Sequence, residues 1–186
     1  MILIRPSSDA DIDAIASIYA HHVLHGTATF ETTPPSAPEM AQRRSDVLSK
    51  DLPWLVVEVD GRVQGYAYAN WFRPRDAFRY CAEDSIYLAP GMEGRGLGRA
   101  LLAELLRCCE RAGMRKMVAV IGDSANQGSI GLHRALGFAH AGTMAACGWK
   151  LGRWLDIVLM ERALGPGGST PPSVTDGTFS ATAAQT

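Results

Sequence analysis

Residues 92–101 read MEGRGLGRAL, with three glycines directly before a run that has helical spacing. Two interpretations fit these glycines. Glycine permits positive φ at a loop-to-helix junction, which is a purely structural use. Alternatively, the free N–H groups of a helix N-terminus, unshielded by side chains and aided by the helix dipole, bind an anion such as phosphate. The ten residues alone do not decide between the two.

The elements around this stretch place it between a strand and a helix. Before it, the pattern predicts strands over 2–5, 54–59, 63–71 and 84–88, and helices from Ser8 or Asp9 and over 38–49. After it, the pattern predicts an apolar helix ending near Gly113, a strand over 117–121, a helix over 127–136 and a strand pair over 139–150 and 154–162. This order predicts one α/β (α+β) domain over 1–164, with a mixed, mostly antiparallel sheet and helices on both faces.

Composition and charge limit the possible partners. The chain has 186 residues, 47% of them apolar, and a net charge of -1, so we expect no nucleic-acid partner. Its N-terminus resembles neither a signal peptide nor a membrane span, and the four cysteines form no CxxC pair, so we expect reduced thiols in a cytoplasmic protein. Residues 165–186, rich in Gly, Pro, Ser and Thr, are expected to form a disordered tail.

Two histidines suggest a metal site that the rest of the sequence does not support. His21 and His25 are four residues apart, which places them on one helical face. No HExxH motif or nearby carboxylate accompanies them, so a solvated helix end is favoured and no bound metal is expected.

The glycine stretch differs from two common phosphate-binding patterns. A nucleoside-triphosphate loop requires GK[ST], which is absent. Residues 94–99 read GRGLGR, which lacks the third glycine of the dinucleotide pattern GxGxxG.

The order of elements, RGLG at 95–98 and NQGSIGLHRALGF at 126–138 resemble the GCN5-related N-acetyltransferase (GNAT) superfamily. The resemblance implies that the glycine loop holds the pyrophosphate of acetyl-CoA and that one strand and one helix start hold the rest of it. The residues implied are Gly94, Arg95, Gly96, Leu97, Gly98 and Arg99 in the loop, Ile86, Tyr87 and Leu88 in the strand, and Asn126 and Ser129 at the helix. The family usually begins the loop with Gln or Arg, whereas this chain has Glu93, whose carboxylate repels a pyrophosphate unless it points away.

Further segments resemble one branch of this family, the phosphinothricin and methionine sulfoximine acetyltransferases. They are TATFETTP (27–34), PWLVVEVDGRVQGYAYA (53–69), FRYCAEDSIYL (78–88), IGLHRALGF (130–138) and GWKLGRWLDI (148–157). The resemblance implies acetyl transfer to the α-amino group of a small amino acid analogue, as a detoxification. It also implies a homodimer joined through the strands that carry Trp149, Lys150, Trp154 and Asp156.

Acetyl transfer to an amine requires a base, an oxyanion site and a proton for the thiolate. By resemblance, Glu83 is the catalytic base, although its position alone also fits a solvated glutamate beside the strand over 84–88. For the oxyanion, we expect backbone N–H groups splayed by a bulge in that strand.

The proton donor is the second predicted catalytic residue. In this branch a histidine takes the place of a tyrosine acid, which maps onto His133, although helical histidines are more often packed or surface residues. Asn126 fits a helix cap, a bond to the CoA arm, or both.

Substrate recognition is predicted around a basic loop. Arg73, Arg75 and Arg79 fit the carboxylate or phosphinate oxygens of an acidic acceptor, or simply a solvated loop. The resemblance implies a more specific set that borders the acceptor: Phe30 with Glu31 close by, Arg73, Pro74, Arg75, Glu83, Asp84 and Ser85.

Two rival functions remain open at this point. One is a CoA-binding module without catalysis, for which Glu93 is the only hint. The other is an acetyltransferase with a different amine acceptor, although a basic loop disfavours polyamines and aminoglycosides.

Overall fold

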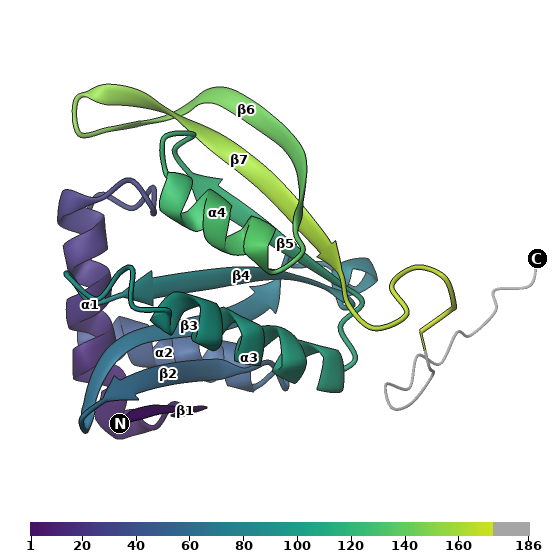
Figure 1. Ribbon diagram of the computed structural model, residues 1–186, viewed down its shortest axis with the longest axis horizontal. Coiled ribbons are helices and arrows are strands. Elements are labelled where there is room, and N and C mark those ends of the chain that lie inside the picture. Colours follow the sequence, from purple (N-terminus) through teal and green to yellow (C-terminus); the bar gives the residue numbers. More distant parts are fainter. Residues whose placement is uncertain (173–186) are drawn as a thin grey trace, which may run out of the picture.

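A computed structural model of the chain describes residues 1–172 and shows one seven-stranded sheet (Figure 1). The strands are β1 (Ile2–Pro6), β2 (Trp54–Val59), β3 (Arg62–Trp71), β4 (Cys81–Leu88), β5 (Lys116–Gly122), β6 (Ala139–Lys150) and β7 (Arg153–Ala163). The helices are α1 (Ile12–His25), α2 (Ala37–Leu48), α3 (Leu97–Arg111) and α4 (Gln127–Ala135), with short 3-10 turns at η1 (Asp9–Asp11) and η2 (Asp76–Phe78). The strand order is β1-β2-β3-β4-β5-β7-β6, and only β4 and β5 pair in parallel, which confirms the predicted mixed, mostly antiparallel sheet.

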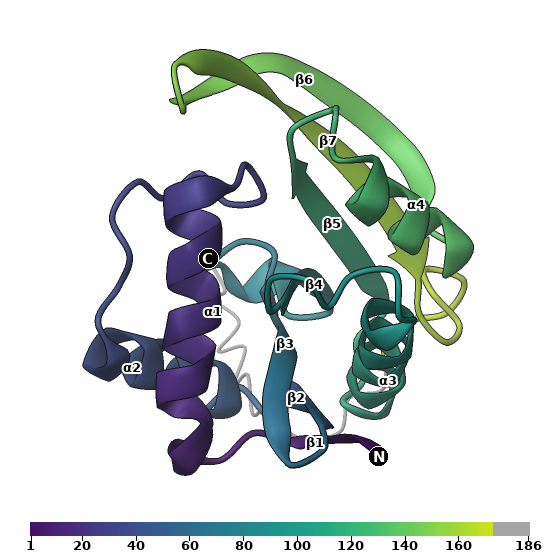
Figure 2. The same ribbon diagram turned by 60° about the vertical axis from the view of Figure 1, so that its left-hand side comes forward.

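Helices cover both faces of the sheet, as the element order predicts. Figure 2 shows α1 and α2 on one side of the strands and α3 and α4 on the other. The apolar stripe of α3, with Leu101, Leu102 and Leu105 fully buried, packs into the core. Burial of this stripe fixes α3 against the sheet, and with it the glycine stretch that precedes the helix.

The element boundaries differ from the predictions in one place that matters for the site. β4 begins at Cys81, three residues before the predicted start, because residues 81–84 pair with β5. Glu83 therefore lies within the strand, opposite Asn70 of β3, and not just before it. Consecutive acids are poor strand formers, so the local sequence obscured this start.

The two parallel strands separate halfway along β4. Residues 81–84 pair with residues 116–119, and beyond Asp84 the strands are no longer joined. The predicted bulge is not the cause: β4 keeps an uninterrupted register with β3 from Ala82 to Leu88. The opening arises because β5 stays paired with β7 along its length, while β4 stays paired with β3. Figure 2 shows β4 and β5 diverging.

The predicted disordered tail falls only partly within the described residues. In the described part, Arg115 Nη2 donates hydrogen bonds to the carbonyl and hydroxyl oxygens of Thr170, at 3.0 Å and 2.9 Å. Residues 173–186 lie outside the described residues, so disorder there stays a prediction. None of the helices within residues 1–172 is long and apolar enough to cross a membrane.

Candidate active site

Two cavities adjoin where β4 and β5 separate. The first, here called the glycine-loop cavity, has a volume of about 650 Å³ and is lined by the loop before α3, the end of β4 and the start of α4. The second, the Glu83 cavity, has a volume of about 250 Å³ and is lined by β4, β5, α1 and the loop after α1. Five residues line both cavities: Ala28, Ile86, Tyr87, Asn126 and Ser129. A ligand in one cavity is therefore next to a ligand in the other.

The glycine loop has the geometry of an anion cradle. Gly94 and Gly96 have φ of 73° and 78°, and no atom lies within 4 Å of where their side chains would begin. Gly96 is also the N-cap of α3, so the unpaired N–H groups of the helix face open space beside a stretch of bare backbone. A positive φ and an open approach at one helix start support the anion interpretation of this stretch.

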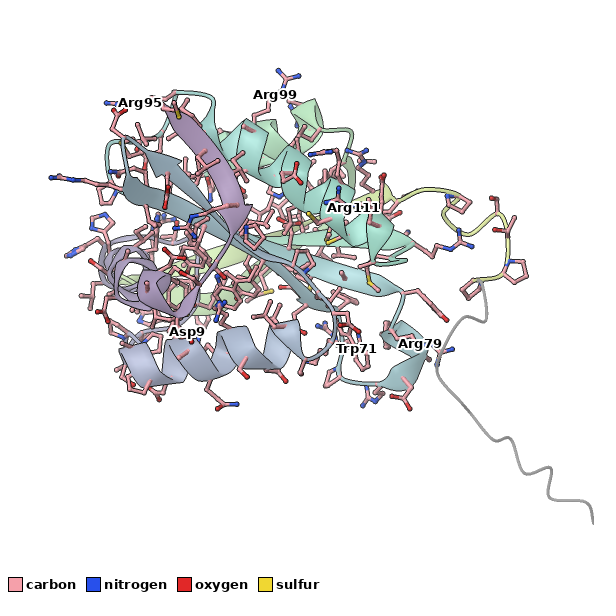
Figure 3. The ribbon with its side chains drawn as sticks, turned by 90° about the horizontal axis from the view of Figure 1, so that it is seen from below. Asp9, Trp71, Arg79, Arg95, Arg99 and Arg111 are labelled. Carbon is pink, nitrogen blue, oxygen red and sulfur yellow. The ribbon has the colours of Figure 1, made fainter. Side chains whose placement is uncertain are left out.

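The side chains of this loop divide into two groups. Glu93, Arg99 and the predicted glycines line the cavity, whereas Leu97 is buried in the core. Figure 3 shows Arg95 and Arg99 at the same end of the molecule, by the start of α3, and Arg95 is exposed outside the cavity lining. Glu93 is exposed and lines the cavity, and its charge opposes the lowering of the His22 pKa by burial.

His22 is a site residue that the sequence did not identify. Its Nε2 donates to the carbonyl of Leu88 at 2.8 Å, at the end of β4, and the ring lines the glycine-loop cavity. Burial lowers the pKa of His22, although the bond to Leu88 opposes this. A neutral ring thus satisfies a strand carbonyl that β5 has left unpaired. The spacing of His21 and His25 forms a recognisable pattern in the sequence, whereas His22 is part of none.

Glu83 has the environment of a base that works near neutral pH. It lines the smaller cavity, and burial raises its pKa to about 7, with a further rise from the charge of Asp84. The charge of Arg73 opposes this rise. The physical cause is desolvation, because a carboxylate in a small cavity loses water that stabilises its charged form. The solvated alternative for Glu83 does not fit this burial.

Asp84 and His133 form a buried ion pair that joins β4 to α4. The Nε2 atom of His133 lies 3.0 Å from Asp84 Oδ2, and both side chains are 2% exposed. The Nδ1 atom lies 2.7 Å from the carbonyl of Ser129, which only accepts, so this nitrogen carries a proton. Burial lowers the pKa of His133, but the bond and charge of Asp84 and the Ser129 carbonyl outweigh it, and the pKa is raised.

Asn126 and Ser129 begin α4 at the border of both cavities. The Asn126 side chain accepts a hydrogen bond from the Ser129 N–H at 3.1 Å, which makes Asn126 the N-cap of the helix. The capping interpretation is thus confirmed. The bond from Asn126 to the CoA arm stays a prediction, for which the position of both residues between the cavities is suitable.

The predicted acceptor residues separate into two places. Phe30, Asp84 and Ser85 line the Glu83 cavity. Arg73, Pro74 and Arg75 are exposed on the loop between β3 and β4, outside that lining, and Arg73 is close enough for its charge to lower the pKa of Glu83. Figure 3 shows Trp71 and Arg79 at this end of the molecule, away from Arg95.

Two tyrosines complete the Glu83 cavity. Tyr19 of α1 and Tyr68 of β3 both line it. The periodicity of α1 predicts that Tyr19 packs in the core, and it does, yet its hydroxyl reaches the loop that carries Phe30. No local pattern marks a core tyrosine as part of a site.

Metal chemistry finds no support among the described side chains. Within residues 1–172, no three His, Cys, Asp or Glu residues are arranged to hold a metal ion. The four cysteines are free thiols.

Comparisons with known proteins agree with this geometry. The chain matches the Acetyltransferase (GNAT) family over residues 17–138. It is 50% identical over 169 residues to a phosphinothricin N-acetyltransferase of Alcaligenes faecalis, covering 91% of this chain and 86% of that protein. It is 41% identical over 162 residues to an L-methionine sulfoximine/L-methionine sulfone acetyltransferase of Salmonella typhimurium, covering 87% and 94%. A solved phosphinothricin acetyltransferase from Sinorhizobium meliloti, in complex with AcCoA, superposes with a TM-score of 0.91 at 48% identity and covers 97% of both chains.

The chain belongs to the GNAT family of acetyltransferases, and its cosubstrate is acetyl-CoA. The resemblance noted in the sequence is confirmed, and so is the fold it implied.

The ion pair gives a prediction about stability. Because the pKa of His133 is raised in the folded state, the pair stabilises the fold fully below the unfolded pKa of about 6.5, and this contribution is lost as pH rises through the folded value. We expect Asp84→Asn to lower the free energy of unfolding by about 3 kcal/mol at pH 6 and by less at pH 9. Urea titrations at both pH values measure this, with the exposed Asp51→Asn as control. An equal loss at both pH values would contradict the role of the pair.

Proposed function

We propose that this chain transfers the acetyl group of acetyl-CoA to the α-amino group of a small amino acid analogue such as phosphinothricin, methionine sulfoximine or methionine sulfone. One observation carries the proposal: Glu83, with a pKa of about 7, lines a small cavity that adjoins the glycine-loop cavity. The acceptor class comes from the relatives, which act on these compounds by name. We propose that this reaction detoxifies such analogues in the cytoplasm.

The residues present fit acetyl-CoA. Gly94, Gly96 and the N-terminus of α3 offer N–H groups to the pyrophosphate, and Arg99 adds a positive charge. Strand residues 86–88, which β5 leaves unpaired, offer main-chain groups to the pantetheine arm. The thioester of this cosubstrate supplies an activated acetyl group.

Glu83 removes the proton that blocks the amine. An α-amino group has a reference pKa of about 8, so most of it is protonated at neutral pH. Glu83 takes this proton directly or through a water, and the free amine then attacks the acetyl carbon to give a tetrahedral oxyanion. As this collapses, the carbon–sulfur bond breaks and the nitrogen gives up its second proton to solvent, which leaves the amide. A base with a pKa near 7 is deprotonated often enough to act and still basic enough to accept.

The remaining steps need an oxyanion site and a proton for sulfur. The N–H groups of β4 beyond Asp84 that β5 leaves unpaired suit the oxyanion, since the pairing of β4 with β3 fixes them in place. His133 stays the predicted acid for the thiolate. In the fold, however, its two ring nitrogens face Asp84 and Ser129, so this role requires one of those bonds to be released.

Arg73 and Arg75 are proposed to hold the acidic end of the acceptor. Guanidinium groups bind carboxylate and phosphinate oxygens in a bidentate manner, and Arg73 lies near enough to Glu83 to affect its charge.

Release of free thiol from acetyl-CoA tests the function against its rivals. We expect phosphinothricin, methionine sulfoximine and methionine sulfone to be turned over in preference to a panel of ordinary amino acids, polyamines and an N-terminal peptide. Turnover of another amine alone would keep the reaction and replace the acceptor. Binding of CoA without release of thiol in the presence of any amine would favour the other rival, a CoA-binding module that does not catalyse a reaction.

The substitution Glu83→Gln tests the base. We expect kcat to fall about a hundredfold or more, because general-base catalysis contributes at least that much, while acetyl-CoA affinity is unchanged. In the wild type, kcat/KM is expected to rise with pH up to about 7, because Glu83 loses its proton over this range. This rise of kcat/KM with pH is expected to be absent in the variant. Stopped assays over pH 5.5–9 and calorimetry with CoA measure both, with the exposed Glu161→Gln as control. An unchanged rate would remove Glu83 as the base.

The homodimer is proposed to form through the β6–β7 hairpin. Four large apolar side chains are exposed there: Met144, Trp149, Leu151 and Trp154. Trp149 and Trp154 are 59% and 62% exposed and contact each other edge to face, so they offer the aromatic centre typical of an interface. Sedimentation velocity tests this. We expect a dimer for the wild type and a monomer for Trp154→Arg, and a monomeric wild type would exclude it.

A further inference from the structure

The loop that carries Phe30 is held in place from two directions. Glu31 accepts hydrogen bonds from Arg43 of α2, at 2.6 Å, and from the hydroxyl of Tyr19, at 2.9 Å. On the other side, Lys150 of β6 donates a hydrogen bond to the carbonyl of Thr29 at 2.7 Å. The hydroxyl groups of Thr29 and Tyr19 also form a hydrogen bond, at 2.9 Å. Glu31, predicted near the acceptor, thus anchors the loop and does not line the cavity.

The Phe30 ring lies against two glycines. A side-chain carbon on Gly148 of β6 would overlap two carbons of the ring, and one on Gly122 of β5 would lie 3.2 Å from a third. Gly122 has a second constraint, because its side chain would also overlap the carbonyl of Thr27. Neither glycine has a positive φ, so their small size, and not backbone freedom, permits the approach.

Phe30 separates Gly148 from the Glu83 cavity. The ring lines that cavity, whereas Gly148 lines none of the cavities described in residues 1–172. A larger residue at position 148 would push the ring away from β6 and into the space beside Glu83. The cavity measures only about 250 Å³, so a small displacement removes a significant part of the space for an acceptor.

The alternation of β6 explains why one strand contacts both the loop and the solvent. Side chains of consecutive strand residues point to opposite faces. Gly148 and Lys150 face the loop, and Trp149 between them is exposed. The buried ammonium of Lys150 also bonds the His22 carbonyl at 3.4 Å, so this stretch of β6 is fixed to the end of α1.

We propose that Gly148 is a positioning residue for the acceptor: the absence of a side chain there sets the place of the Phe30 ring and thereby the shape of the acceptor pocket. This inference rests on the proposed acetyl transfer and deepens it, because it separates acceptor binding from acetyl-CoA binding. Phe30 lines the Glu83 cavity and not the glycine-loop cavity, so a displacement of its ring acts on the acceptor and not on acetyl-CoA.

Steady-state kinetics of Gly148→Ala test the proposal, with methionine sulfone as acceptor. We expect the acceptor KM to rise about tenfold or more, because small misplacements in a site are costly, while the KM for acetyl-CoA stays within about twofold. Gly142→Ala is the matched control, since Gly142 lies on the same strand, is similarly half-buried and has open space where a side chain would begin. Its kinetics are expected to equal those of the wild type.

A double variant separates displacement of the ring from general damage. Phe30→Leu with Gly148→Ala removes the overlapping ring carbons, so the double variant should show a smaller acceptor defect than the sum of its two single variants. The crystal structure of Gly148→Ala adds a reading that does not depend on turnover, namely the displacement of the Phe30 ring.

Three results would overturn the inference: an unchanged acceptor KM in Gly148→Ala, an equal rise in both KM values, or an unmoved Phe30 ring. Failure of the proposed function is distinct, because it would show as absence of acetyl transfer to any amino acid analogue by the wild type, and the ring position would still decide the inference.

Discussion

The separation of β4 from β5 after Asp84 is the constraint on which the site depends. Buried strands normally pair along their whole length, because an unpaired N–H or C=O away from water is costly. Here each strand keeps one partner, β3 for β4 and β7 for β5, so the fold survives the loss of the pairing between them. The separated edges leave main-chain groups facing two cavities, and His22 satisfies one of the exposed carbonyls.

The charges at this point follow from strand geometry. Glu83 and Asp84 are neighbours on β4, so their side chains point to opposite faces of the sheet. Asp84 pairs with His133 of α4, and both residues line the smaller cavity together with Glu83. Burial disfavours the charged form of both groups: it raises the pKa of Glu83, and it lowers the pKa of His133, where the bond and charge of Asp84 outweigh it.

The local patterns of the sequence were sufficient for the fold and for part of the site. The glycines before α3, the apolar stripe of the helix and the cap at Asn126 are short-range signals, and each lies where the sequence predicts. The Asp84–His133 pair joins residues 49 positions apart, and the contact of Gly148 with Phe30 crosses most of the chain, so no periodicity predicts them.

Hydrogen exchange along β4 tests the central claim most directly. If the separated strand edge binds the cosubstrate, saturating CoA will slow exchange at those amides of residues 85–88 that face β5, and at the glycine loop, while residues 81–84 are unchanged. Protection of the glycine loop without any change at residues 85–88 would contradict the account, because the separation of the strands would then have no part in binding.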